Sequence, residues 1–153
     1  MIEKFKNIFE GLDRAHGVTI VGESNGNGTK VKGKSFVKRE PITNELWQKH
    51  LDGVDSLGVI PINDEDKCRW GCIDVDEYPL DHVSIAKKLA EKKLPFVVSK
   101  SKSGGAHIFL FFKDYVPAGL VHNKIKELAA FMGLGHCEVF PKQEKLLREG
   151  NPN

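Results

Sequence analysis

Apolar residues recur along the chain with two spacings, one typical of helices and the other typical of strands. Ile2, Phe5, Phe9 and Leu12 lie three or four residues apart, which predicts an amphipathic helix. Residues 106–112 form a short apolar run that follows two glycines, which predicts a buried strand. The full pattern predicts helices at 2–15, between Thr43 and Gly53, at 81–93 and at 117–132, and strands at 18–21, 31–37, 57–62, 69–75, 95–100, 106–112 and 137–140.

From residue 69 onward the predicted order is β-α-β-β-α-β, which is the order of the RRM-like, ferredoxin-like unit. In that topology the first strand lies between the third and the fourth. We therefore predict an α+β fold whose main part is residues 57–153. Residues 1–56 are predicted to form a helix and hairpin extension that packs on it.

Two acidic residues end the predicted strand 69–75. Because alternate side chains of a strand share a face, Asp74 and Asp76 project together while Val75 points into the core. Two such carboxylates repel each other unless a positive group lies between them, and a hard divalent cation with oxygen ligands meets that need. The alternative is a pair of solvated acids at a strand end.

The predicted strand order brings further polar residues beside this pair. His107 begins the third strand and Glu138 lies on the fourth, with Cys137 and Val139 expected to point into the core. A third acid makes the group able to hold two metal ions, which we expect to be Mg²⁺ or Mn²⁺.

The loop between the second and third strands contains Ser101, Lys102 and Ser103, followed by two glycines and His107. Glycine lets backbone N–H groups turn toward an anion, while hydroxyls and lysines add further donors. The loop is thus suited to a triphosphate, although an ordinary glycine-containing hairpin has the same composition.

A basic segment without acids precedes residue 40. It is interpreted as a contact surface for the nucleic-acid backbone, and the alternative is a solvated charged loop. The residues assigned to nucleic-acid binding are Lys30, Lys32, Lys34, Lys38 and Arg39, together with Lys100.

Composition limits the other possibilities. The net charge is only +2, so affinity for nucleic acid has to come from local clusters of basic residues. No apolar stretch approaches the roughly 20 residues of a membrane span, and the N-terminus lacks the pattern of a secretory signal. The odd count of 3 cysteines argues against a disulfide framework and for a reducing, cytoplasmic compartment.

A zinc site is an alternative interpretation of the cysteines and one neighbouring histidine. Cys68 and Cys72 would bind with His136 and Cys137. The spacing of Cys68 and Cys72 on one strand sets their side chains far apart, which disfavours this interpretation.

Three motifs in this order resemble the archaeo-eukaryotic primase superfamily, the catalytic core of primases and primase-polymerases. They are GCIDVDEY, SKSKSGGAHIFLFF and HCEVFPKQ. The segment ITNELWQKHLDGVDSLGVIPINDEDKCRWGCIDVDEY is similar to primases of phages and of mobile or conflict elements. The resemblance covers roughly residues 42–147 and leaves the first 40 residues outside.

The resemblance implies a catalytic palm that acts as a template-directed nucleotidyltransferase in DNA replication. Asp74, Asp76 and Glu138 would be metal ligands, and His107 would contact the nucleotide phosphates, with Ser101, Lys102 and Ser103 as supporting contacts. Expected partners are a single-stranded DNA template, NTPs or dNTPs, and a helicase domain or protein, with no membrane. The host would be a bacterial or archaeal cell, or one infected by a phage.

Two alternatives to this enzyme stay open. One is a primase-like module that binds nucleic acid or a nucleotide without catalysis, and the other, ranked last, is a metal-dependent nuclease that uses the same acids. Related proteins usually continue past F-P-K-Q into a further strand. The end of this chain is therefore either a frayed tail or a stop inside a longer protein.

Overall fold

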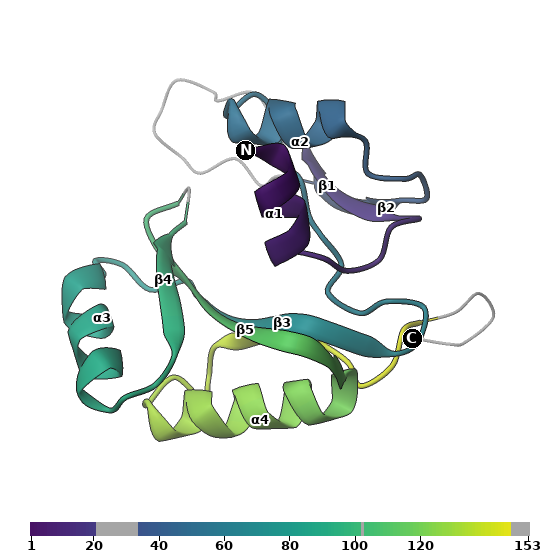
Figure 1. The fold of residues 1–153 in the computed structure, drawn as a ribbon. Coiled ribbons are helices and arrows are strands. Elements are labelled where there is room, and N and C mark those ends of the chain that lie inside the picture. The colour runs from purple at the N-terminus through teal and green to yellow at the C-terminus, as the bar shows by residue number, and fades with distance from the viewer. Residues whose placement is uncertain (21–33, 102, 148–153) are drawn as a thin grey trace. The chain divides into compact units, whose positions relative to one another are not determined.

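The computed structural model of the chain describes residues 1–20, 34–101 and 103–147 (Figure 1). Within these residues the fold is mixed α+β, with four helices and six strands in two antiparallel sheets. The chain divides into two compact units, Met1–Ile60 and Pro61–Asn153. That residues 1–56 and 57–153 form an extension and a separate catalytic domain stays a prediction. None of the helices in the described part is long and apolar enough to cross a membrane.

The first unit contains two short helices and a two-stranded antiparallel sheet. Thr43 caps the second helix as predicted, since its hydroxyl oxygen accepts the backbone N–H of Leu46 at 3.2 Å. The elements are α1 (Ile2–Ile8), β1 (His16–Ile20), β2 (Lys34–Lys38) and α2 (Asn44–Leu51).

Two predictions for the first unit are wrong in extent or type. The helix predicted over 2–15 ends at Ile8, because the chain beyond it bonds elsewhere: Leu12 donates its backbone N–H to the Ile60 carbonyl at 2.9 Å. The strand predicted at 57–62 is absent from the described residues. Gly58 forms one isolated bridge with Gly17, and Pro61 has no N–H to continue a ladder.

The second unit contains a four-stranded antiparallel sheet in the order β4-β5-β3-β6. This order is the predicted one, with the first strand between the third and the fourth. Figure 1 shows α4 running along one face of the sheet and α3 beside β4. The elements are β3 (Lys67–Val75), α3 (His82–Glu91), β4 (Phe96–Lys100), β5 (Ala106–Pro117), α4 (Ala118–Phe131) and β6 (Glu138–Phe140).

Alternation along β3 separates the core from the opposite face of the sheet. Ile73 and Val75 are both 0% exposed, so Val75 points into the core as predicted. Gly71 shares their face and lies tightly against α4, because a Cβ atom there would be 3.0 Å or less from the side chains of Val121 and Ile125. The absence of a side chain at Gly71 therefore lets α4 pack directly on the sheet.

The remaining boundaries differ from the predicted ones by a few residues. β5 is longer than predicted and reaches Pro117, and its pairing with β3 shifts register between Cys68 and Trp70. β6 begins at Glu138, so Cys137 lies in the preceding turn and is half-buried rather than part of the core. The prediction that Cys137 points into the core with Val139 is therefore wrong.

Candidate functional site

One row of paired residues crosses all four strands of the larger sheet. Asp74 on β3 is the register partner of His107 on β5 and of Glu138 on β6, and His107 is the partner of Ser99 on β4. Directly opposed residues share a face with Cβ atoms about 4.5–5.5 Å apart. Three residues distant in the sequence, Asp74, His107 and Glu138, are thus neighbours on the face opposite α4.

Each predicted acid has a partner of its own. Asp74 Oδ1 lies 3.4 Å from His107 Nε2, and Glu138 Oε1 lies 2.6 Å from Lys142 Nζ. The Tyr78 hydroxyl donates to Asp76 Oδ1 at 2.9 Å. Each acid thus has its own polar neighbour, and of the three neighbours only Lys142 is a permanent cation.

The acids nevertheless act on one another. Burial raises the pKa of the Asp74 carboxyl above its usual range, and the nearby charges of Asp76 and Glu138 raise it further, while His107 and Lys142 oppose this shift. A partly buried carboxylate with two acidic neighbours favours the binding of a positive group. Asp76 directly follows the end of β3, and its charge acts on Asp74 in the row.

The donor set fits a hard divalent cation. Three carboxylates, two on neighbouring strands and one directly after β3, offer only oxygen ligands, which Mg²⁺ and Mn²⁺ prefer. Their oxygens do not lie together as a closed group in the described structure, so the assignment of Asp74, Asp76 and Glu138 as metal ligands stays a prediction.

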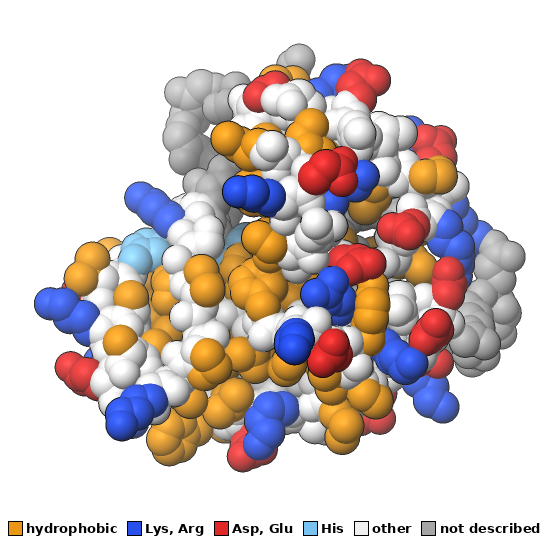
Figure 2. Space-filling view, in the orientation of Figure 1, with side chains coloured by type: hydrophobic (Ala, Val, Ile, Leu, Met, Phe, Trp, Pro, Cys, Tyr) orange, Lys and Arg blue, Asp and Glu red, His pale blue; other side chains and the backbone are white. Residues whose placement is uncertain are grey.

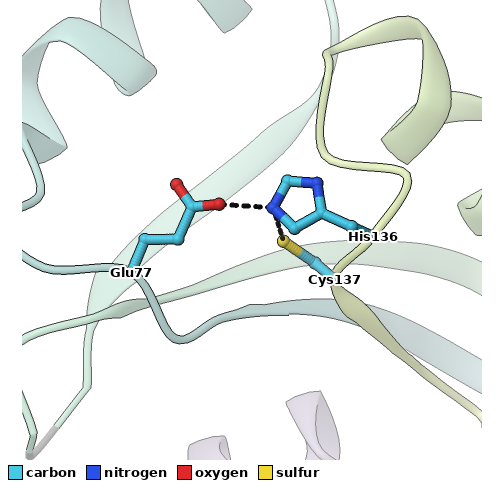
Figure 3. Close-up of side chains that lie close together, drawn as sticks. All are labelled: Glu77, His136 and Cys137. Atoms are coloured by element: carbon cyan, nitrogen blue, oxygen red, sulfur yellow. Dashed lines mark hydrogen bonds and ion pairs between the residues drawn. The ribbon is translucent and has the colours of Figure 1, made fainter.

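A different group of possible ligands does lie together. The group consists of Glu77, His136 and Cys137, whose possible ligand atoms all lie within 4.8 Å of one another (Figure 3). Among the described residues it is the one such group of three or more His, Cys, Asp or Glu side chains. Burial raises the pKa of the Cys137 thiol, as do the neighbouring charges of Glu77, Asp74 and Asp76.

The glycine loop docks against the end of β3. A Cβ atom on Gly105 would overlap the carbonyl oxygen of Val75, so only glycine fits there. The Ser101 and Ser103 hydroxyls are 3.2 Å apart, and the Ser103 hydroxyl lies 2.7 Å from the Tyr78 hydroxyl. The loop is thereby connected through Tyr78 to Asp76. Lys102 lies outside the described residues.

The predicted nucleic-acid contacts are divided between the two units. Lys34, Lys38 and Arg39 lie on or directly after β2 in the first unit, whereas Lys100 ends β4 in the second. Lys38 Nζ pairs with Glu40 at 2.7 Å. Figure 2 shows basic and acidic side chains interspersed over the face that it draws. Lys30 and Lys32 lie outside the described residues.

Two residues of the site were not predicted from the sequence. Tyr78 follows the D-x-D strand and Lys142 follows Glu138 by four positions, so their closeness to the motifs was the available signal. Neither lies in a regular element, and loop side chains have no periodicity from which their direction follows.

The zinc interpretation that included Cys68 and Cys72 finds no support in the described structure. Both cysteines are buried in β3, and burial raises the pKa of both thiols. Neither belongs to the group of Glu77, His136 and Cys137 that lies together among the described residues.

Comparison with protein families agrees with the three motifs. The family model described as the archaeo-eukaryotic primase domain of the TOTE conflict system matches residues 19–153. The chain belongs to this family. The match begins within the segment that the sequence resemblance had left outside, so the archaeo-eukaryotic primase domain includes much of the first unit. No curated protein matches the chain.

Proposed function

We propose that the protein is a template-directed nucleotidyltransferase that makes or extends primers from NTPs or dNTPs, with the larger sheet as its catalytic palm. The observation that carries the proposal is the row of Asp74, His107 and Glu138 on neighbouring strands. Membership of the primase family in conflict systems supports the same reaction class.

Asp74, Asp76 and Glu138 are the proposed ligands of two Mg²⁺ or Mn²⁺ ions. When bound, such ions lower the pKa of an attacking 3′-hydroxyl and neutralise the charge of a pyrophosphate leaving group. The role of the chain is to supply oxygen donors from two adjacent strands. Glu138 would exchange its ion pair with Lys142 for this ligation, which leaves the Lys142 ammonium free for a phosphate oxygen.

His107 and the serine loop are proposed to orient the triphosphate. His107 lies in the same row as the acids, and Ser101 and Ser103 present hydroxyl groups next to each other. Lys102, between the two serines in sequence, would add a positive charge. Holding the reacting groups in place in this way can supply several kcal/mol of the barrier.

A single-stranded DNA template is the proposed partner of the basic residues, including Lys30 and Lys32, with Lys100 at the end of β4. A helicase domain or protein is proposed to supply that single strand, in the cytoplasm.

The test is nucleotide incorporation on a single-stranded template in Mn²⁺. The variant with Asp74→Asn and Asp76→Asn removes two proposed ligands at nearly unchanged volume, and we expect incorporation to fall at least about a hundredfold, since two of three charged groups are lost. The matched control, Asp52→Asn with Asp55→Asn, makes the same change of charge in the first unit and should keep wild-type rates. Equal rates in the site variant and the wild type would contradict the proposal.

A second candidate is a module that binds a nucleotide or nucleic acid without catalysis. The observation that favours it is that each acid pairs with its own neighbour, His107, Tyr78 or Lys142. Calorimetric titration of a nucleoside triphosphate with and without Mn²⁺ separates the two candidates. Binding of the triphosphate that requires Mn²⁺ favours the enzyme. In a parallel titration with a single-stranded oligonucleotide, binding that does not depend on Mn²⁺ favours the module.

A further inference from the structure

Three side chains with nitrogen, sulfur and oxygen donors converge beside the row of acids. Glu77 Oε1 is hydrogen-bonded to His136 Nε2, and Cys137 Sγ lies 3.7 Å from the same nitrogen. Figure 3 shows the three side chains pointing toward one another from two chain segments. Glu77 comes from the segment after β3, and the other two come from the turn before β6.

The fold explains why these distant segments meet. Asp74 and Glu138 are register partners, so the residues that follow β3 lie beside those that precede β6. The turn is closed by the Cys137 N–H, which donates to the Leu134 carbonyl at 3.0 Å. Because the backbone turns here, the side chains of His136 and Cys137 are not forced to opposite sides as they would be in a strand.

We propose that Glu77, His136 and Cys137 form a binding site for Zn²⁺. Zinc in proteins takes thiolate, imidazole and carboxylate ligands with bonds of about 2.0–2.3 Å, and tetrahedral geometry then sets the donor atoms about 3.3–3.6 Å apart. The observed separation of 3.7 Å between Cys137 Sγ and His136 Nε2 is close to that value. The direct hydrogen bond between Glu77 and His136 has to open for the ion to lie between these two side chains.

The donor chemistry distinguishes this site from the neighbouring acids. A thiol and an imidazole favour a softer ion than Mg²⁺, whereas Asp74, Asp76 and Glu138 offer only oxygen. Asp74 and Asp76 both act electrostatically on Cys137, so the cluster lies in a negative field that attracts cations. The two sites would therefore bind different metals side by side.

Zinc at this position would join the segment after β3, which carries Asp76, to the start of β6, which carries Glu138. Glu77 follows Asp76 directly, and Cys137 precedes Glu138 directly. An ion held by Glu77 and Cys137 fixes the distance between these segments. Three protein ligands leave a fourth position for water, and the exposure of Glu77 and His136 makes that position accessible. This inference does not depend on the proposed nucleotidyltransfer.

The experiment is a titration of the reduced protein with Co²⁺, followed by absorption spectroscopy. Cobalt adopts the coordination of zinc and gives a charge-transfer band when a thiolate is a ligand. We expect one equivalent of Co²⁺ to produce this band and Zn²⁺ to abolish it, because Zn²⁺ binds such sites more tightly. Absence of the band in the wild type would overturn the proposal.

Variants identify the ligands. Cys137→Ser should lose the charge-transfer band, and His136→Gln should weaken Co²⁺ binding at least about tenfold while the circular dichroism spectrum stays unchanged. Asp74→Asn with Asp76→Asn should keep the band, which separates this site from the proposed catalytic metals. His50→Gln is the histidine control and should bind Co²⁺ as the wild type does. A band that survives in Cys137→Ser would come from another thiol and would contradict the assignment.

Discussion

At the scale of single residues, the site is a group of like charges whose repulsion is limited by nearby positive groups and hydrogen-bond donors. Asp74 is the most buried of the three acids, and its carboxyl interacts with two other acids as well as with His107 and Lys142. A protein rarely keeps such an arrangement for stability alone, since each unneutralised charge lowers the free energy of unfolding. We therefore expect the charge of Asp74 to lower the free energy of unfolding by a measurable amount.

We expect Asp74→Asn to raise the free energy of unfolding at neutral pH by up to about 1 kcal/mol, the size of one partly exposed charge interaction. Because the pKa of Asp74 is raised above 3.8, the folded protein binds a proton more tightly than the unfolded chain does. Wild-type stability thus falls as pH rises from the ordinary pKa through the raised one. The advantage of the variant should grow over the same interval.

Urea denaturation of both proteins from about pH 4 to about pH 8 measures this difference. Asp114→Asn, at an exposed position of β5, is the control and should change stability by no more than about 0.5 kcal/mol at any pH. A difference between Asp74→Asn and wild type that is constant over the range, or that shrinks with rising pH, would contradict the expected cost.

At the scale of elements, the alternation of side chains was enough to predict the larger sheet. The apolar residues of β3 and β5 define one face, and the order of helices and strands defines which strands are neighbours, so the row of Asp74, His107 and Glu138 followed from the sequence. Segments held by single contacts could not be predicted in this way. Gly58 has one bridge partner in the described structure, and Cys137 lies in a turn, where periodicity gives no direction.

The contact between the glycine loop and β3 gives a prediction for an element junction. Gly105→Ala should lower the free energy of unfolding by about 3 kcal/mol, because the added Cβ overlaps the Val75 carbonyl oxygen and pushes the start of β5 away from β3. Gly104→Ala is the matched control. There the nearest atom, Tyr78 Cε1, is 3.7 Å away and only the φ of +98° is unfavourable, so about 1 kcal/mol is expected.

Guanidinium denaturation of the two variants and the wild type tests this difference. If Gly104→Ala proves as destabilising as Gly105→Ala, backbone conformation rather than contact with β3 explains the choice of glycine in this loop. The contact-based account of how the loop is positioned beside Asp76 would then be wrong.

At the scale of the whole molecule, charge is nearly balanced. The net charge of +2 and the mixture of signs on the face in Figure 2 give little long-range attraction to a polyanion. Binding of the proposed template strand would then depend on a few local contacts. The match to the primase family extends over both units and includes the basic strand β2 as well as the acids.

We expect binding of a single-stranded oligonucleotide to weaken with salt, and we expect the basic residues of the first unit to account for part of that dependence. Each phosphate contact on a single strand contributes about 0.7 to the slope of log K against log salt concentration. Replacing Lys34, Lys38 and Arg39 by Gln should therefore reduce the slope by about 2. Fluorescence anisotropy at several salt concentrations measures it.

The control separates contact from net charge. Replacing Lys87, Lys88 and Lys92 by Gln removes the same number of charges from exposed positions on and after α3. If Lys34, Lys38 and Arg39 touch the strand, the slope falls in their variant and is nearly unchanged in the control, because counterions are released only where a phosphate is contacted. Equal, small losses of affinity in both variants, with unchanged slopes, would mean that Lys34, Lys38 and Arg39 contribute only to the overall charge and touch no phosphate. The template surface would then lie elsewhere in the chain.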